Sequence, residues 1–259
     1  MKVVILCGGK GTRLREETEY RPKPMVPIGG KPILWHIMKT YAAYGHTEFI
    51  LCLGYKGDVI KEWFRNYRWM TSDLTICLGT GETRFHDRTD ENDWQVTLVD
   101  TGEETMTGGR VKRIERFLGA DEEFLLTYGD GVGRIDIAAS IDCHRRSRRH
   151  LTVTGVHPPG RFGELVVADG IVTNFLEKPQ VTAGGRINGG YFVANRAVFE
   201  YLDDDPGVIF EREPMNALSR DGQLACYEHD GFWQPMDTYQ EFLLLNRLWA
   251  EERAEWRVW

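Results

Sequence analysis

The chain has 259 residues, of which 42% are hydrophobic and 27% charged, and these fractions are typical of a folded globular protein. They exclude a disordered, collagen-like or coiled-coil chain, and the length predicts one large domain or two small ones. A net charge of −7 disfavours extensive binding to nucleic acid or to an anionic membrane, although a local basic pocket is compatible with it.

The five cysteines are scattered and form no C-x-x-C pair, so neither a disulfide framework nor a zinc site is predicted. The N-terminal apolar run Val3–Cys7 is too short for the core of a signal peptide. A membrane-spanning helix needs about 18 consecutive apolar residues, and no stretch of the sequence approaches that length. We therefore expect a reduced, cytoplasmic protein without a membrane span.

Predicted strands and helices alternate along the first 150 residues. Val3–Cys7 is rich in β-branched residues and bounded by glycines, which is typical of a strand buried on both faces of a parallel sheet. Lys31–Tyr44 has apolar residues at helical spacing, with Pro32 suited to the first turn and Gly45 to the end. Further strands are predicted at Phe49–Leu53, Leu74–Leu78, Val96–Val99 and Phe124–Tyr128, and further helices at Asp58–Met70, Gly108–Leu118 and Ile135–Arg146. This order predicts an α/β fold with right-handed crossovers, helices on both faces and a mostly parallel, Rossmann-like central sheet.

The pattern changes after residue 150. Leu165–Ala168 and Ile171–Leu176 flank Asp169–Gly170, a strong signal for a two-residue β-hairpin. Arg186–Val193 is a further predicted strand, and a long C-terminal helix begins at about Thr238. We expect a single domain over residues 1–259, with an α/β part (1–150), an appended antiparallel β portion (151–237) and a C-terminal helix (238–259).

Thr80–Glu104 is polar and has little periodicity apart from the strand Val96–Val99. Its acidic residues and His86 match no familiar metal-ligand spacing, and solvated loop charges are the commoner explanation. Long loops of this kind in compact domains are usually lids or interaction arms.

A glycine-rich loop, Gly8–Thr12, directly follows the first strand, with Arg13 beyond it. Glycines at the carboxyl end of a strand let backbone N–H groups converge on a phosphate, and an arginine adds a charge-assisted fork, although a simple chain reversal has a similar sequence. Leu14 breaks the dinucleotide pattern G-x-G-x-x-G, and Gly30-Lys31-Pro32 breaks the Walker pattern. Pro22 and Pro24 stiffen the chain around Lys23, which suits a charge that must be aimed.

These motifs resemble the signature of the sugar-phosphate nucleotidylyltransferases, and Ile28–Ile37 resembles their glucose-1-phosphate cytidylyltransferase branch. The similarity covers essentially the whole chain and continues through Asp100–Gly102, Met106–Arg110, Tyr128–Gly131, Phe162–Gly163, Glu177–Pro179, Asn188–Gly190 and Phe232–Thr238. Cys7 stands where the family often has alanine, and because both side chains are small the loop geometry is expected to be kept.

The resemblance implies a Mg²⁺ ion held by Asp130 and Asp237, which would reduce the repulsion between two anionic substrates. For Asp237, the sequence alone favours a helix N-cap instead. Arg13 would neutralise the departing phosphates and Lys23 would stabilise charge on the α-phosphate. The implied nucleotide contacts are Leu6, Gly8, Gly9, Gly11, Thr12, Arg13, Lys23, Thr105, Arg110 and Gly129. On spacing alone, Thr107–Arg110 is equally a plain helix start.

The implied contacts to the sugar 1-phosphate are Gly163, Glu177, Lys178, Asn188 and Gly189. Without the family, Glu177 and Lys178 are an exposed ion pair before a proline, and Phe232 and Trp233 are either core residues or a wall of the sugar pocket.

The implied reaction is transfer of a cytidylyl group from CTP to α-D-glucose 1-phosphate, which needs no general base because the attacking phosphate oxygen is already ionised. Transfer from UTP or dTTP, or to another hexose 1-phosphate, is the nearest alternative, and a non-catalytic nucleotide-sugar sensor is a rival from another class. Family members are often homo-oligomers.

Overall fold

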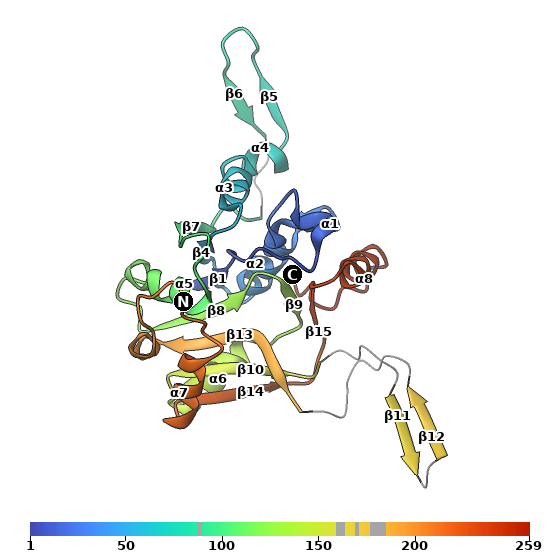
Figure 1. Ribbon diagram of the computed structural model, residues 1–259. Helices are drawn as coiled ribbons and strands as arrows, with labels where there is room; N and C mark the ends of the chain where they lie inside the picture. The colour runs from blue at the N-terminus through green and yellow to red at the C-terminus, as the bar shows by residue number, and fades with distance from the viewer. Residues whose placement is uncertain (87–89, 159–163, 169–170, 177–184) are drawn as a thin grey trace.

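A computed structural model describes residues 1–86, 90–158, 164–168, 171–176 and 185–259. Its centre is a seven-stranded sheet with the order β14-β10-β13-β8-β1-β4-β7 (Figure 1). The strands of this sheet are β1 (Val3–Leu6), β4 (Glu48–Leu53), β7 (Gln95–Asp100), β8 (Glu123–Tyr128), β10 (Leu151–Val156), β13 (Ile187–Asn195) and β14 (Leu224–His229). Neighbours pair in parallel except at β13, which is antiparallel to both β8 and β10. The predicted α/β class and mostly parallel sheet are confirmed.

Successive residues of the inner strands point to opposite faces of the sheet. Val3 and Ile5 belong to one buried apolar cluster and Val4 to another. The first cluster includes Ile37 of α2 (Ile33–Ala43), and the second includes Val111 of α5 (Thr107–Arg113). Because both faces are covered by helices, a strand such as β1 is a continuous apolar run, as predicted.

The predicted helices are present, but several of them differ in length from the prediction. They are α1 (Arg15–Thr18), α2 (Ile33–Ala43), α3 (Gly57–Arg65), α4 (Tyr67–Thr71), α5 (Thr107–Arg113), α6 (Ile137–Ser147), α7 (Glu213–Arg220) and α8 (Tyr239–Ala250), with 3₁₀ turns η1 (Lys23–Met25), η2 (Glu115–Phe117) and η3 (Arg196–Tyr201). The helix predicted over 58–70 is divided at Asn66 into α3 and α4. The C-terminal helix ends at Ala250, and the residues after it place Trp256 in the core.

The region after residue 150 contributes more to the central sheet than predicted. β11 (Glu164–Ala168) and β12 (Ile171–Leu176) form the expected antiparallel pair, although Asp169–Gly170 lies outside the described residues. β13, which was predicted as part of the appended portion, lies instead between β8 and β10. Strands β10 and β14 were not predicted, and they join the same sheet.

Leu74–Leu78 is a strand only in part, and it is not in the central sheet. β5 (Leu74–Ile76) pairs with β6 (Thr83–Phe85) in an antiparallel hairpin that projects from the body (Figure 1). Two further small pairs, β2 (Pro27–Ile28) with β3 (Lys31–Pro32) and β9 (Gly131–Gly133) with β15 (Trp233–Pro235), lie in the body.

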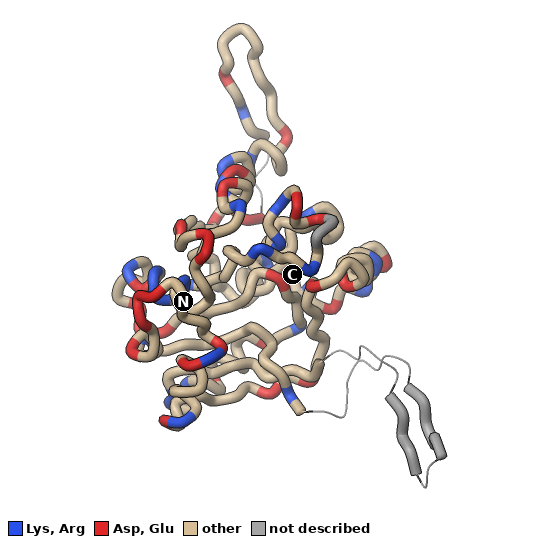
Figure 2. Tube along the Cα trace, viewed as in Figure 1, with Lys and Arg blue, Asp and Glu red and all other residues tan. Residues whose placement is uncertain are grey.

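All five cysteines are free thiols. Among the described residues, no helix is both long and apolar enough to cross a membrane. Basic and acidic residues are interspersed along the helices of the body, whereas the hairpin is mostly uncharged (Figure 2).

A fully buried histidine, His36 of α2, packs among the aromatic residues of the C-terminal segment. Its Nε2 lies 2.9 Å from the Ile28 carbonyl oxygen and must donate to it. Its Nδ1 accepts from the Trp256 indole N–H at 3.4 Å. Both contacts suit a neutral ring, and burial lowers the pKa of His36 to about 4.

The free energy of unfolding should therefore decrease as the pH is lowered from about 6.5 to 4. In this range the unfolded chain takes up a proton at His36 that the folded protein excludes. This one group gives a slope of up to about 1.4 kcal/mol per pH unit, and about 3 kcal/mol in total. Urea denaturation of the wild type and of His36→Gln at pH 7.5, 6, 5 and 4.5 measures this pH dependence, which should be weaker in the variant. His46, His144 and His229, whose pKa values burial also lowers, are present in both proteins. Equal slopes would contradict the assignment.

Candidate active site

Two adjoining pockets lie at the carboxyl ends of β1 and β8, where ligands of open α/β sheets gather. The first has a volume of ≈ 380 Å³ and is lined by the glycine loop, the start of α5 and the end of β8. Every residue predicted to contact the nucleotide lines it: Leu6, Gly8, Gly9, Gly11, Thr12, Arg13, Lys23, Thr105, Arg110 and Gly129. The structure therefore brings the whole predicted set together.

The second pocket has a volume of ≈ 520 Å³, and its lining includes Asn188 and Gly189 from the predicted sugar-phosphate set. Gly163, Glu177 and Lys178 lie outside the described residues. The residues that line both pockets are Arg13, Tyr128 and Asp130. Two ligands, one in each pocket, would meet at these shared residues.

Arg110 of α5 holds the glycine loop in place. Its two terminal nitrogens donate to the carbonyl oxygens of Leu53 (2.9 Å), Gly8 (3.1 Å) and Glu103 (3.1 Å), and to the Thr101 hydroxyl (2.7 Å). A Cβ atom on Gly8 would lie 2.1 Å from the guanidinium carbon, so a side chain there would push the guanidinium out of these hydrogen bonds. Burial lowers the pKa of Arg110, and these oxygens compensate the buried charge. Thr107–Arg110 is thus both a helix start, as α5 begins at Thr107, and part of the pocket.

Lys23 joins the two predicted metal ligands. It begins the 3₁₀ turn η1 between Pro22 and Pro24, and its side chain is 9% exposed. Its Nζ lies 2.7 Å from Asp130 Oδ2 and 2.5 Å from Asp237 Oδ1. Burial lowers the pKa of Lys23, but the two carboxylates outweigh it and the net shift is upward. The ammonium is therefore charged in the pocket wall.

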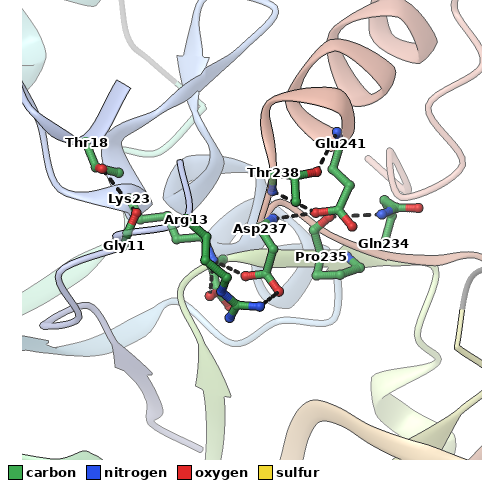
Figure 3. Close-up of polar contacts among 10 residues, drawn as sticks. Gly11, Arg13, Thr18, Lys23, Gln234, Pro235, Asp237, Thr238 and Glu241 are labelled. Carbon is green, nitrogen blue, oxygen red and sulfur yellow. Dashed lines mark hydrogen bonds and ion pairs between the residues drawn. The ribbon is translucent and has the colours of Figure 1, made fainter. Parts of the chain in front are cut away.

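Asp237 is not the N-cap of the last helix. Thr238 caps α8, accepting from the Glu241 backbone N–H at 3.3 Å, while the Glu241 carboxylate accepts from the Thr238 N–H at 2.9 Å (Figure 3). The Asp237 carboxylate points instead toward Lys23 and Arg13, with Arg13 Nη1 3.0 Å from its Oδ2 (Figure 3). The N-cap role that the sequence alone favoured for Asp237 is therefore wrong.

The donor set at this point suits a hard divalent cation. Asp130 and Asp237 converge on one atom, Lys23 Nζ, so an oxygen of each carboxylate lies within 2.7 Å of the same point. Over the described ranges, no three His, Cys, Asp or Glu side chains gather as a metal site, and this covers the described part of Thr80–Glu104. Two carboxylates without further protein ligands is the arrangement that Mg²⁺ takes when substrate phosphates and water complete its coordination.

Several residues of the pockets were not among the predicted contacts. Trp233 lines the second pocket and donates to the Gly189 carbonyl oxygen at 2.8 Å, and it also packs against the core, as Phe232 does, so Trp233 has both of the roles between which the sequence could not decide. Tyr128, Thr107 and Glu211 line the first pocket. Tyr128 and Thr107 stand inside motifs, so their neighbours were a signal, but Glu211 follows no pattern that marks a site.

The chain belongs to the nucleotidyl transferase family, whose model matches residues 2–250. It is 51% identical over 259 residues, all of both chains, to the glucose-1-phosphate cytidylyltransferases of Salmonella typhimurium and Salmonella typhi. The crystal structure of HddC from Yersinia pseudotuberculosis shares the fold, with a TM-score of 0.69 at 24% identity over 96% of this chain and 99% of that chain. Members of the family generally use a divalent metal.

Lys23→Met should destabilise the metal-free protein by about 1–3 kcal/mol, since it leaves two neighbouring carboxylates without their shared cation. Urea denaturation in EDTA measures the loss. Lys10→Met is the matched control, because Lys10 pairs with Glu104 on the surface, where solvent screens the ion pair, and its loss should cost clearly less. Equal losses in the two variants would mean that the Lys23 pairs add nothing beyond a surface ion pair.

Proposed function

We propose that this protein transfers the cytidylyl group of CTP to α-D-glucose 1-phosphate, forming CDP-glucose and pyrophosphate. The observation that carries the proposal is the full-length identity of 51% to two glucose-1-phosphate cytidylyltransferases. The two pockets that meet at Arg13 and Asp130 support it, because the reaction needs two anionic substrates to approach each other.

The first pocket takes CTP, with the triphosphate along the glycine loop. A phosphate oxygen of the sugar 1-phosphate attacks the α-phosphorus, and the bond from that phosphorus to the bridging oxygen breaks to release pyrophosphate. Arg13, whose side chain is 69% exposed, is free enough of packing to follow the departing phosphates, and Lys23 stabilises charge on the α-phosphate. The attacking oxygen is ionised, so no side chain has to remove a proton.

The second pocket takes the sugar 1-phosphate. Asn188 and Gly189 line it, and we assign Gly163, Glu177 and Lys178 to the same substrate on the family motif. The chain acts as one catalytic domain over residues 1–259, since β10, β13 and β14 complete the sheet that carries the glycine loop.

Asp130 and Asp237 would hold Mg²⁺. When bound, the ion offsets the charge of the phosphates and orients the two substrates for in-line displacement. The carboxylates would supply hard oxygen ligands of the kind that Mg²⁺ prefers.

We also infer a homo-oligomer that works in the cytoplasm. The β5–β6 hairpin supports the first inference, because Leu74–Gly81 carries no charge and the Leu78 side chain at its tip is 93% exposed. An apolar projection of this kind is normally covered by a partner. Five free thiols suit a reducing compartment.

A pyrophosphate-release assay with Mg²⁺ tests the reaction, with CTP, UTP and dTTP each crossed against a panel of hexose 1-phosphates. We expect CTP with glucose 1-phosphate to be fastest. Backbone groups around Gly8, Gly9 and Gly129 match only one hydrogen-bonding edge, so UTP should be about tenfold to a hundredfold slower. If CTP and UTP compete at equal concentration and CDP-glucose is the minor product, the nucleotide assignment is wrong.

Asp130→Asn and Asp237→Asn should each raise the Mg²⁺ concentration for half-maximal activity and lower kcat by about 10²-fold. The double variant should lose less than the product of the single losses, because both residues act on one ion. Asp203→Asn, at an exposed position outside both pockets, is the control. Multiplicative losses, or an unchanged metal requirement, would assign the aspartates separate roles.

Leu78→Asp should reduce the molar mass measured by light scattering at micromolar concentration, because it places a charge on the exposed apolar tip of the hairpin. Leu243→Asp on α8, where the side chain is 49% exposed, introduces the same charge elsewhere and should leave the mass unchanged. A monomeric wild-type protein would refute the oligomer, and an unchanged mass in Leu78→Asp would remove the hairpin from the interface.

A further inference from the structure

A chain of hydrogen bonds runs from the first pocket to the second through residues outside the proposed chemistry. Glu211 lines the first pocket, here called the nucleotide pocket, and Asn188 lines the second, here called the sugar pocket. Tyr128 lines both. The Tyr128 hydroxyl donates to Glu211 Oε1 at 2.5 Å, and Asn188 Nδ2 donates to the same hydroxyl oxygen at 3.0 Å. We propose that Glu211 is a positioning residue for the sugar 1-phosphate, which it orients by acting through Tyr128 on the side-chain amide of Asn188.

The direction of each hydrogen bond in this chain is determined by Glu211. An ionised carboxylate only accepts, so the Tyr128 proton must point toward it. The hydroxyl oxygen then has only lone pairs to offer on its other side, and only the NH₂ end of the Asn188 amide can pair with them. The other end, Asn188 Oδ1, accepts from the Gly190 backbone N–H at 2.8 Å. Consequently the amide has one orientation, with its second N–H left as a donor.

Packing and further hydrogen bonds hold Tyr128 and Glu211 in place. The Tyr128 ring lies against Gly190, where a Cβ atom would come within 2.5 Å of the ring, and makes an edge contact with Phe192. Burial, and next the Glu211 charge, raise the pKa of Tyr128, so the hydroxyl keeps its proton. On the other side, the Thr107 hydroxyl donates to Glu211 Oε2 at 2.6 Å and accepts from the Phe210 N–H at 2.9 Å.

Without the Tyr128 contact, the Asn188 amide keeps only its hydrogen bond from the Gly190 N–H, so its second N–H is held less firmly as a donor to the sugar. Losing one oriented hydrogen bond weakens binding by about tenfold. The effect should fall on the sugar 1-phosphate and not on the nucleotide, although Glu211 itself lies in the nucleotide pocket. This asymmetry distinguishes the hydrogen-bond chain from Glu211 through Tyr128 to Asn188, here called the relay, from a general disturbance of the fold. The assignment of one pocket to each substrate rests on the proposed function.

Steady-state kinetics of Tyr128→Phe and Glu211→Leu test the relay, with the hexose 1-phosphate that the wild type uses fastest. We expect KM for the sugar 1-phosphate to rise about tenfold in each, with KM for CTP changed less than about threefold. The double variant should be no worse than either single variant, because both interrupt one chain. Glu211→Gln can still turn an acceptor toward Tyr128 and should restore most of the sugar KM.

Tyr201→Phe is the matched control. Tyr201 also donates to a carboxylate, Asp221 Oδ2 at 3.0 Å, but it lies outside both pockets. Its loss should leave both KM values unchanged. Losses that multiply in the double variant, equal rises in both KM values, or a Glu211→Gln variant as impaired as Glu211→Leu would overturn the proposal.

If the wild type turns over no member of the panel, the proposed function fails and the relay is judged on the Asn188 side-chain amide alone. Its two N–H resonances should shift in Tyr128→Phe and in Glu211→Leu, and should not shift in Tyr201→Phe. Unchanged resonances in the first two variants would refute the relay independently of catalysis.

Discussion

The bridge that Lys23 makes to Asp130 and Asp237 is the contact on which the rest of the site depends. It joins residues that are 107 and 214 positions apart in the chain, and so ties the loop after β1 to the end of β8 and to the start of α8. Such a contact requires the fold to be complete, since each of the three side chains is held by a different element.

Arg110 likewise joins segments that are far apart in the chain, and it does so behind the glycine loop. By donating to three carbonyl oxygens and a hydroxyl, it replaces hydrogen bonds that loops at a sheet edge would otherwise make to water. The glycine loop can then keep a shape that exposes its backbone N–H groups to a ligand. A buried cation fills the space behind the glycine loop, and a side chain on Gly8 would collide with it.

The sequence predicted the parts of the molecule that local rules control. β1 and α2 were found from apolar runs and periodicity, and Lys23 from the prolines beside it, because these signals come from residues close together in the chain. Leu74–Leu78 was misplaced because a short apolar run pairs as readily in a projecting hairpin as in a central sheet. β14 was missed because its alternating burial at the sheet edge gives a weak pattern. The sequence alone favoured Asp237 as the N-cap of the last helix, and this was wrong, because Asp and Thr both favour that position and only the tertiary partners of Asp237 leave the cap to Thr238. Glu211 is recognisable only by the side chains that surround it.

The charges at the junction of the pockets explain why two aspartates are kept beside two cations. Lys23 and Arg13 are both paired with these carboxylates, so the four groups have no net charge and offer little long-range attraction to a triphosphate. Positive charge beyond the side chains would therefore favour the approach of two anionic substrates, and in the proposed function a divalent cation held by Asp130 and Asp237 would supply it. With the carboxylates engaged by such an ion, the Lys23 ammonium, already buried and fixed between two prolines, would have its donors available to a phosphate beside it. On this proposal, the carboxylates keep Lys23 charged and in place before the substrates bind, and they would free its donors when the substrates bind.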